Sequence, residues 1–308
     1  MRVLIVANHN PGKFSTFVIE QVEALRQLGV EIEFFGVHGK GALGYLSNLK
    51  NLKKKIERYH PDLIHAHYGL CGLLANLQRT VPVVTTYHGS DIHSGGIILF
   101  YSKLSMWLSI YNIFVSKKLF VQSGYQGRNK SIIACGINDT VFCPVERNEA
   151  RKQLKWDVDG IYVLFAGAFD NEVKNSPLAK AATSLVEGAQ LIELRGYSRE
   201  QVCLAMNAAN CLLVTSFQEG SPLVVKEAMA CGTPVVSVDV GDVKETTRGL
   251  DGYYLTTYNE HDVAASLQQA ISFKGKTVAR QQILELGLSN ELVAKKLMKI
   301  YNSIIRQD

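Results

Sequence analysis

The sequence predicts an α/β protein made of two doubly wound domains, each built on a parallel sheet. Short apolar runs alternate with amphipathic helical segments along the whole chain, which is the pattern of a parallel sheet with crossover helices. The chain has 308 residues, long for one core and sufficient for two domains of ordinary size. Residues 144–148 are polar and turn-prone, as is typical of a linker.

The composition is that of a soluble globular protein, and its charge and cysteines indicate the kind of ligand and compartment. Hydrophobic residues make up 47% of the chain and charged residues 20%, as in a soluble globular protein. The formal net charge of +5 suits an anionic small molecule or a lipid headgroup surface and does not call for nucleic acid. Six cysteines without a C-x-x-C pair indicate buried free thiols in a reducing cytoplasm.

The first predicted domain, residues 1–144, begins with a buried strand over residues 2–7, an apolar run too short for a signal peptide. A loop with Gly12 and Ser15 follows, and then a helix from Thr16 to Gln27. Ligands of doubly wound sheets collect at the carboxyl ends of strands, so this loop is predicted to face the cleft between the domains. A plain connecting turn is an equally good interpretation. The absence of G-x-G-x-x-G argues against a nicotinamide dehydrogenase.

A second strand is predicted over residues 30–36, followed by a flexible glycine-rich segment over residues 38–44. The next helix places five cations opposite apolar residues at helical spacing. These cations are Lys50, Lys53, Lys54, Lys55 and Arg58. A basic amphipathic helix suits contact with anionic lipid, and an ordinary solvated helix face explains the pattern at least as well.

Histidines cluster at the ends of the third and fourth predicted strands. His65 and His67 share one strand face because side chains alternate with a period of two. A metal site needs a third ligand at a workable spacing and none is evident, so no metal is predicted and His65 is expected to pack in the core. Tyr68 closes the third strand, and His88 lies in the turn after the fourth, residues 81–85.

Residues 95–114 are apolar and aromatic enough to raise the question of a membrane span. Lys103 and several serines and asparagines interrupt the run. A spanning helix needs about 20 predominantly apolar residues without a central charge, so this segment is predicted not to cross a membrane.

The second predicted domain, residues 149–289, contains the most informative stretch, residues 215–230. An apolar strand over residues 211–214 runs into a polar loop, and a helix follows, with Ser221 as the predicted N-cap and Pro222 in the first turn. Glu219 precedes Glu227 by eight residues, about 11 Å along a helix, so both carboxylates could contact one extended ligand. Two glutamates alone would also fit an exposed first-turn Glu and a solvated Lys226–Glu227 pair.

This arrangement resembles the Glu-x(7)-Glu signature of retaining GT-B glycosyltransferases of family 4, of the type that builds bacterial cell-surface polysaccharides. The run from Glu219 through Pro234 to Val236, the Lys174 loop, and the turns at residues 65–69 and 88–91 carry the resemblance. It implies two Rossmann-like domains facing a central cleft. It also implies that residues 290–308 form a helix that crosses back onto the first domain.

The resemblance also implies roles for particular residues. His88, Lys174 and Glu219 would be catalytic: Lys174 would neutralise the departing diphosphate, and the other two would position the sugar. The donor would be held by Gly196, Tyr197, Gly220, Ser221, Pro222, Leu223 and Glu227, with Glu227 on the ribose. The acceptor or cleft loop would comprise Gly12, Ser15, His67 and Tyr68.

The implied reaction is the transfer of a hexosyl group from a nucleotide-diphosphate sugar to a lipid-linked or oligosaccharide acceptor, with retention and without a metal or other cofactor. It would take place in the cytoplasm or at the inner face of the membrane. The chain departs from the family pattern at Ala168, where an arginine is usual; Arg195, Lys226 and Lys13 are possible substitutes. The main alternative is a nucleotide-sugar-binding module without catalytic power. A GT-B epimerase is a further alternative with less support.

Overall fold

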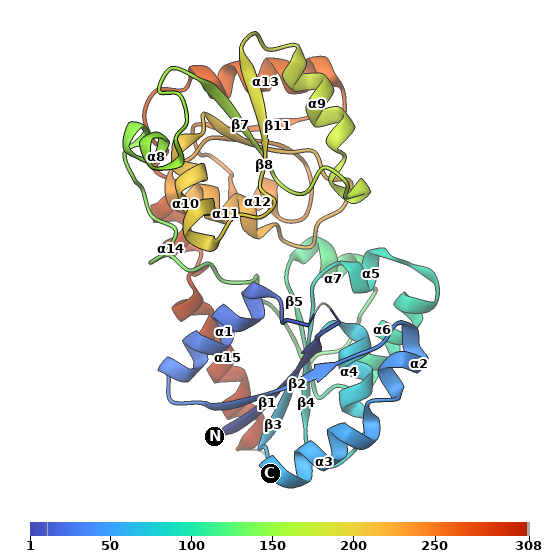
Figure 1. The fold of residues 1–308 in the computed structure, drawn as a ribbon. Coiled ribbons are helices and arrows are strands. Elements are labelled where there is room, and N and C mark those ends of the chain that lie inside the picture. Colours follow the sequence, from blue (N-terminus) through green and yellow to red (C-terminus); the bar gives the residue numbers. More distant parts are fainter. Residues whose placement is uncertain (11, 307–308) are drawn as a thin grey trace. The chain divides into compact units, whose positions relative to one another are not determined.

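The computed structural model describes residues 1–10 and 12–306. The chain divides into two compact units (Figure 1), each with its own parallel sheet. Unit 1 comprises Met1–Gly136 and the terminal helix α15 (Asn290–Ile305), and unit 2 comprises Ile137–Ser289. The predicted linker, residues 144–148, therefore falls inside unit 2. The predicted α/β class with two Rossmann-like units is confirmed.

The sheet of unit 1 has six parallel strands in the order β2-β1-β3-β4-β5-β6. Their bounds are β1 Arg2–Asn8, β2 Glu31–Val37, β3 Leu63–His67, β4 Val83–Tyr87, β5 Tyr111–Phe114 and β6 Lys130–Ile132. The helices besides α15 are α1 Thr16–Gln27, α2 Gly41–Leu46, α3 Leu49–Tyr59, α4 Gly69–Asn76, α5 Ser90–His93, α6 Gly96–Leu108 and α7 Lys117–Ser123.

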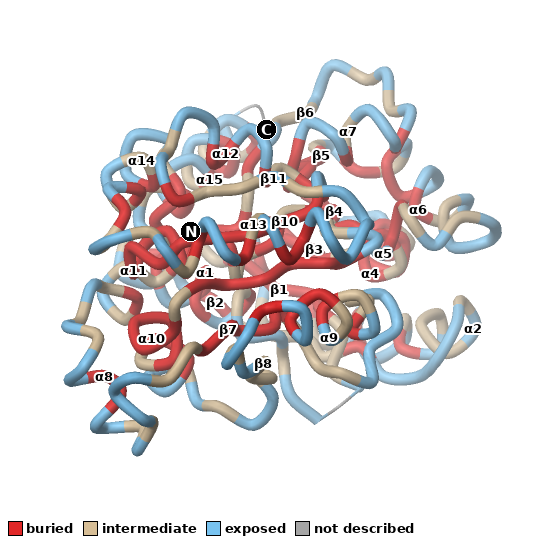
Figure 2. The backbone as a smooth tube through the Cα atoms, turned by 90° about the horizontal axis from the view of Figure 1, so that it is seen from above, coloured by how far each residue is buried: buried red, intermediate tan, exposed pale blue. Residues whose placement is uncertain are grey.

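Strand β1 shows why this sheet is buried on both faces. Its alternate residues Val3 and Ile5 pack on one face with α1 and α15, whereas Leu4 and Val6 pack on the other with α3 and α4. A strand covered on both faces reads as a continuous apolar run, and that run is what the sequence shows. Figure 2 shows β1, β3 and β4 largely buried and exposed stretches along the helices.

The sheet of unit 2 has five parallel strands in the order β11-β10-β9-β7-β8. Their bounds are β7 Ile161–Phe165, β8 Ala189–Glu193, β9 Cys211–Val214, β10 Val235–Val238 and β11 Tyr253–Thr256. The helices are α8 Arg147–Leu154, the 3₁₀ turn η1 Glu172–Lys174, α9 Ser176–Ser184, α10 Arg199–Ala208, α11 Leu223–Cys231, α12 Val243–Thr246, α13 Glu260–Ser272 and α14 Ala279–Glu285.

The terminal helix α15 belongs to unit 1 although it follows unit 2 in the sequence. Its apolar face enters the same core as Val3 and Ile5 and is closed by Tyr301, which is fully buried. The hydroxyl of Tyr301 lies 2.5 Å from Nδ1 of His65 on β3. The helix therefore both seals one face of the sheet and supplies a partner for a buried histidine.

Two local expectations were wrong. The glycine-rich segment predicted as flexible over residues 38–44 contains the start of helix α2, and Nδ2 of Asn48 donates to the carbonyls of Gly44 and His38 at 2.8 Å each. Ser221 was expected to cap the helix after β9, but it lies before the N-cap of α11, which is Pro222.

Candidate functional site

Lys174 and Glu219 meet beyond the carboxyl ends of the adjacent strands β7 and β9. Nζ of Lys174 donates to Oε1 of Glu219 at 2.6 Å, and Oγ of Ser216 donates to the same oxygen at 2.8 Å. The hydroxyl of Thr215 donates to the Lys174 carbonyl at 2.9 Å and so holds the turn η1 against the end of β9. Sequence reasoning placed Lys174 and Glu219 in one site, and the structure brings them into contact.

Gly167 makes this geometry possible. A Cβ atom at position 167 would lie 2.6 Å from Cγ of Lys174, closer than carbon atoms pack. The lysine stem therefore lies directly over the backbone at the end of β7, and only glycine leaves room for it.

Glu227 is buried on α11 and is ion-paired with Arg199, the first residue of α10. NH1 of Arg199 donates to Oε1 of Glu227 at 2.7 Å, and the side chain of Glu227 is only 5% exposed. The guanidinium also lies over the ring of Phe142, 4.5 Å from its centroid. A buried carboxylate requires such a partner. The interpretation of Glu227 as half of a solvated surface pair is therefore wrong.

Arg199 is the functional residue that sequence reasoning missed. The capping box between Ser198 and Gln201 is present as predicted and makes Arg199 the first residue of the helix. The capping box predicts where Arg199 lies in α10. It does not predict that Arg199 pairs with Glu227, because Glu227 lies on another helix.

The residues that precede α11 are fixed by Lys226. This lysine is buried at 1% side-chain exposure, and its Nζ donates to Oδ2 of Asp242 at 2.9 Å. Oγ of Ser221 donates to the same oxygen at 2.7 Å and contacts Lys226. The Ser221 hydroxyl thus does not cap α11, and no described side chain does. In the first turn the N–H of Val225 donates to the Pro222 carbonyl at 3.3 Å, and the N–H groups of Leu223 and Val224 can bind an anion.

The three cations proposed in place of the missing arginine lie in different surroundings. Lys226 is engaged with Asp242, as described. Arg195 pairs with Asp170, two residues after Ala168, and its Nε lies 3.7 Å from Oε1 of Glu193. Lys13 belongs to unit 1. Arg195 thus contacts the loop that follows Ala168 through Asp170. The neighbouring turn holds Gly196 at a φ of +83°, followed by Tyr197.

Unit 1 contains a stack of three histidines. The rings of His65 and His67 have centroids 4.6 Å apart, and those of His67 and His88 have centroids 5.2 Å apart. Nδ1 of His67 lies 3.0 Å from Nε2 of His88, whose Nδ1 in turn lies 3.5 Å from the Cys135 sulfur. His65 is held by Tyr301 and Thr86. The prediction that His65 packs in the core is thus met by contacts on both ring nitrogens.

Burial keeps these histidines neutral. It lowers the pKa of His67 to about 3 and that of His65 well below 6.5. Burial, and then the neighbouring His67, also lower the pKa of His88 well below 6.5. All three are therefore hydrogen-bonding groups rather than cations at neutral pH.

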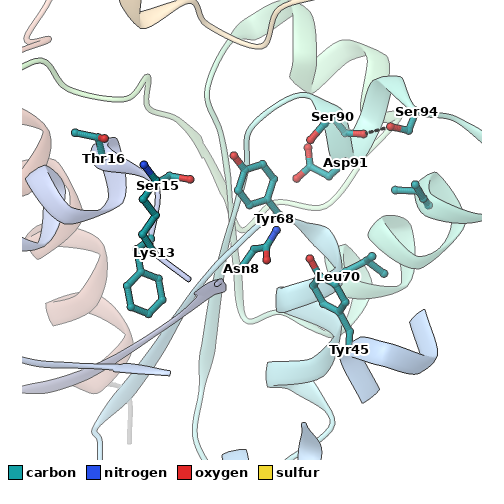
Figure 3. A pocket seen from close by; sticks show the side chains of 12 residues that line it. Asn8, Lys13, Ser15, Thr16, Tyr45, Tyr68, Leu70, Ser90, Asp91 and Ser94 are labelled. Atoms are coloured by element: carbon teal, nitrogen blue, oxygen red, sulfur yellow. Dashed lines mark hydrogen bonds between the residues drawn. The ribbon is translucent and has the colours of Figure 1, made fainter. Parts of the chain in front are cut away.

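A cavity of about 490 Å³ lies within unit 1 (Figure 3), and it is lined mostly by polar side chains. Ser15 and Tyr68, two of the residues assigned to the acceptor or cleft loop, line this cavity, and the ring centroid of Tyr68 lies 4.7 Å from that of His88. Tyr68 has a φ of +73°, a conformation uncommon outside glycine and enriched at functional sites. The other lining residues are Asn8, Lys13, Phe14, Thr16, Tyr45, Leu70, Ser90, Asp91, Ser94 and Ile98.

Gly12 precedes this lining. It has a φ of +74° and would meet no atom within 4 Å if a Cβ were added. The positive φ at this position favours glycine in the turn of the loop. Among residues 1–10 and 12–306, no group of three or more His, Cys, Asp or Glu side chains is arranged to hold a metal ion.

Asp91 organises the cavity wall on the β4 side. Its carboxylate accepts N–H groups from Gly69 at 3.2 Å, His88 at 3.2 Å and Gly89 at 2.8 Å. Burial outweighs these hydrogen bonds and raises its pKa from 3.8 to about 6. Between about pH 4 and pH 6 the folded chain therefore binds this proton more tightly than the unfolded chain does.

We expect the contribution of Asp91 to the free energy of unfolding to be greatest at low pH and to fall as the pH rises through 6. The difference in unfolding free energy between the wild type and Asp91→Asn, measured by urea unfolding at a series of pH values, isolates this group. It should decrease by about 2–3 kcal/mol between pH 4 and pH 7. A difference independent of pH would show that Asp91 has an ordinary pKa.

Comparison with known proteins places the chain among glycosyltransferases. Residues 3–123 match the family model described as Glycosyltransferase Family 4, and residues 148–272 match Glycosyl transferases group 1. The chain is 27% identical over 224 residues to a putative teichuronic acid biosynthesis glycosyltransferase of Bacillus subtilis, covering 63% of this chain and 57% of that protein. It is 29% identical over 286 residues to an uncharacterized glycosyltransferase of Methanocaldococcus jannaschii, covering 82% and 73%.

Solved structures share the fold. A sucrose-phosphate synthase from Thermosynechococcus elongatus superposes with a TM-score of 0.86 at 19% identity, covering 100% of this chain and 99% of that one. Anabaena HepE in complex with UDP-glucose gives 0.74 at 17% identity, covering 98% and 100%. At this identity the likeness concerns the fold alone. Taken with the two family models, it shows that the chain belongs to the GT-B glycosyltransferases of family 4.

Proposed function

We propose that this chain transfers a hexosyl group from a nucleotide-diphosphate sugar to a hydroxyl of a glycan acceptor, with retention of the anomeric configuration. The observation that carries the proposal is the contact between Lys174 and Glu219 in the same unit as the uncapped start of α11. A half-buried cation and the N–H groups at the start of a helix suit a diphosphate, whose charge grows as the sugar departs. Among solved structures of this fold, Anabaena HepE has been captured with UDP and with UDP-glucose.

In this reaction the bond between the anomeric carbon and the phosphate oxygen breaks, and the acceptor oxygen forms the new bond to that carbon. The acceptor proton passes to the departing phosphate oxygen, so no separate general base is required. Lys174 and the first turn of α11 receive the charge of the diphosphate, and no metal ion takes part. Glu219 orients Lys174 before the donor arrives and then positions the sugar.

Glu227 and His88 have supporting roles in the proposal. Arg199 fixes the carboxylate of Glu227, which accepts hydrogen bonds from the ribose hydroxyls of the donor. His88 contacts the sugar. Since burial keeps its imidazole neutral, it adds no positive charge where positive charge develops at the anomeric carbon.

The acceptor binds in the cavity of unit 1. Ser15, Tyr68, Ser90 and Ser94 are among the residues that line it, and residues with hydroxyl groups suit the hydroxyls of a sugar. The proposed acceptor is lipid-linked or an oligosaccharide. The proposed location is the cytoplasm, at the inner face of the membrane. None of the helices in the described part of the chain has the length and apolar content needed to cross a membrane.

A screen of UDP-, GDP- and ADP-sugars by thermal shift, followed by a transfer assay, tests the function. The donor should raise the melting temperature by mass action. With an acceptor pool it should give a product whose anomeric NMR coupling matches that of the donor, unchanged by EDTA. An inverted product or loss of activity in EDTA would contradict the proposed mechanism.

One observation favours a second candidate, a nucleotide-sugar-binding module without catalysis. Ala168 stands where the family usually has an arginine, which removes a bidentate phosphate contact. The two candidates differ in the same assay: a binding module would show the thermal shift but neither transfer nor slow donor hydrolysis.

A further inference from the structure

Helix α6 is amphipathic in the opposite sense to an ordinary surface helix. Its buried side carries Ser102 and Ser105, both fully buried, together with Met106. Its outward side carries Trp107 at 79% exposure, Ile97 at 62% and Phe100 at 59%, with Leu104 between them. A helix on a water-soluble surface normally buries its apolar side chains and exposes its polar ones. Figure 2 shows exposed stretches along α6.

Close packing against α4 fixes this orientation. A Cβ atom at Gly69 would lie 2.1 Å from Oγ of Ser102, and one at Gly72 would lie 2.3 Å from Oγ of Ser105. The two helices approach so closely that only small side chains fit between them. Rotating α6 to bury Phe100 or Trp107 would drive a large side chain into this contact, so the fold itself specifies the apolar outer face.

The segment of sequence that contains α6 and α7 is rich in basic residues and has no acidic one. Residues 92–138 contain no aspartate or glutamate, and they contain Lys103, Lys117 and Lys118. Lys103 lies on α6 itself, and its Nζ would be 4.0 Å from a Cβ added at Gly124, the C-cap of α7. Both α6 and α7 belong to unit 1 (Figure 1), and Val121 of α7 is also exposed.

Apolar and aromatic side chains on a helix that also carries Lys103, within a stretch of sequence that has no acidic residue, match the surface of a bilayer that contains anionic lipid. We propose that the outer face of α6, formed by Ile97, Phe100, Leu104 and Trp107, docks the chain on such a bilayer, with Lys103 against the headgroups. Helix α3, the basic helix noted in the sequence, differs because it buries Leu52 and Ile56 and offers mainly charge.

The docking face adjoins the acceptor cavity. Ile98 of α6 lines that cavity, as does Ser94 just before the helix. An amphiphilic acceptor held in the bilayer could therefore present its sugar to the cavity while its lipid stays in the membrane. This last step rests on the proposed function, whereas the docking itself does not.

Tryptophan fluorescence tests the docking at a single residue. The chain has two tryptophans, Trp107 and Trp156, and Trp156 packs on Tyr162 in unit 2. In a full-length Trp156→Phe variant, Trp107 is the sole tryptophan. We expect the emission maximum of Trp107 to shift to the blue when vesicles with roughly 30% phosphatidylglycerol are added, and brominated lipid to quench this emission. Both effects should be much weaker with vesicles of pure phosphatidylcholine or at about 0.5 M salt.

Variants locate the surface. In the Trp156→Phe background, Ile97→Ser with Phe100→Ser should weaken partitioning into the anionic vesicles roughly tenfold or more, because both apolar side chains lose their burial in lipid. These residues are exposed, so the melting temperature should hardly change. The matched control is Lys53→Glu with Lys54→Glu on α3, which should weaken partitioning less than the α6 pair does.

Three results would overturn the proposal: no shift of Trp107 with anionic vesicles, a larger loss from the α3 pair than from the α6 pair, or a wild-type dimer that the α6 pair converts to monomer without any vesicle binding. The last would assign the face to a second copy of the chain. Donor thermal shift is measured on every variant and stays unchanged, so failure of docking and failure of the proposed function give different results.

Discussion

Replacing Lys174 with methionine is expected to lower kcat for sugar transfer by about 10²–10³-fold, because the departing diphosphate loses its nearest fixed cation. In the structure Nζ of Lys174 contacts Glu219 at 2.6 Å, and its stem lies over Gly167. Methionine keeps the stem and removes the charge. Initial rates over a range of donor concentrations separate the effect on kcat from that on KM.

Lys180→Met is the matched control for this substitution. Lys180 lies on α9 of the same unit, and its Nζ sits over the Phe169 ring, 4.5 Å from the centroid. The control removes the same charge from the same unit without touching Glu219, and its kcat should stay within about twofold of wild type, as for a surface position away from the reacting atoms. Equal losses in the two variants would point to a general electrostatic effect and not to a specific contact with the diphosphate.

Arg199→Met is expected to destabilise the chain by about 2–3 kcal/mol, because it leaves the buried carboxylate of Glu227 without its ion-pair partner. The side chain of Arg199 is 30% exposed, so water offsets part of the loss. Urea unfolding measures the effect. Adding Glu227→Gln to Arg199→Met should restore part of the stability, since the buried charge is then gone.

The ion pair between Arg199 and Glu227 should also affect the KM for the donor. Glu227→Gln alone should raise the KM for the donor about tenfold or more, because a neutral amide accepts ribose hydrogen bonds less strongly than a carboxylate does. The exposed pair Lys295–Glu291 on α15 serves as control. Lys295→Met should change stability by no more than about 0.5 kcal/mol and leave the KM unaltered. If Arg199→Met is as mild as this control, the ion pair is not structurally important.

The elements of the fold could be predicted where one local pattern determines them. Helix α1 occupies Thr16–Gln27 as expected, because its apolar period runs from a serine to a glycine that ends it. The capping box at Ser198 was predicted from two residues three positions apart. The order of the strands in each sheet could not be predicted in this way, nor could the packing of α15 on unit 1. Both depend on contacts between residues far apart in the sequence, which no local pattern contains.

The candidate site was predictable to the extent that it consists of a motif. Lys174 and Glu219 belong to the resemblance, but the partner of Glu227 is Arg199, 28 residues earlier and on another helix, and no spacing rule links them. The apolar segment over residues 95–114 was recognised as unusual. Which face of α6 is buried depends on Gly69 and Gly72 of a different helix, so the sequence alone could not show that its apolar side faces outward.

A crystal structure of the chain with UDP, or with whichever nucleoside diphosphate binds in the thermal-shift screen, tests the central claim most directly. We predict diphosphate oxygens about 3 Å from Nζ of Lys174 and from the first N–H groups of α11, and the ribose against Glu227. A diphosphate bound in the cavity of unit 1, or a ribose out of reach of Glu227, would contradict the account.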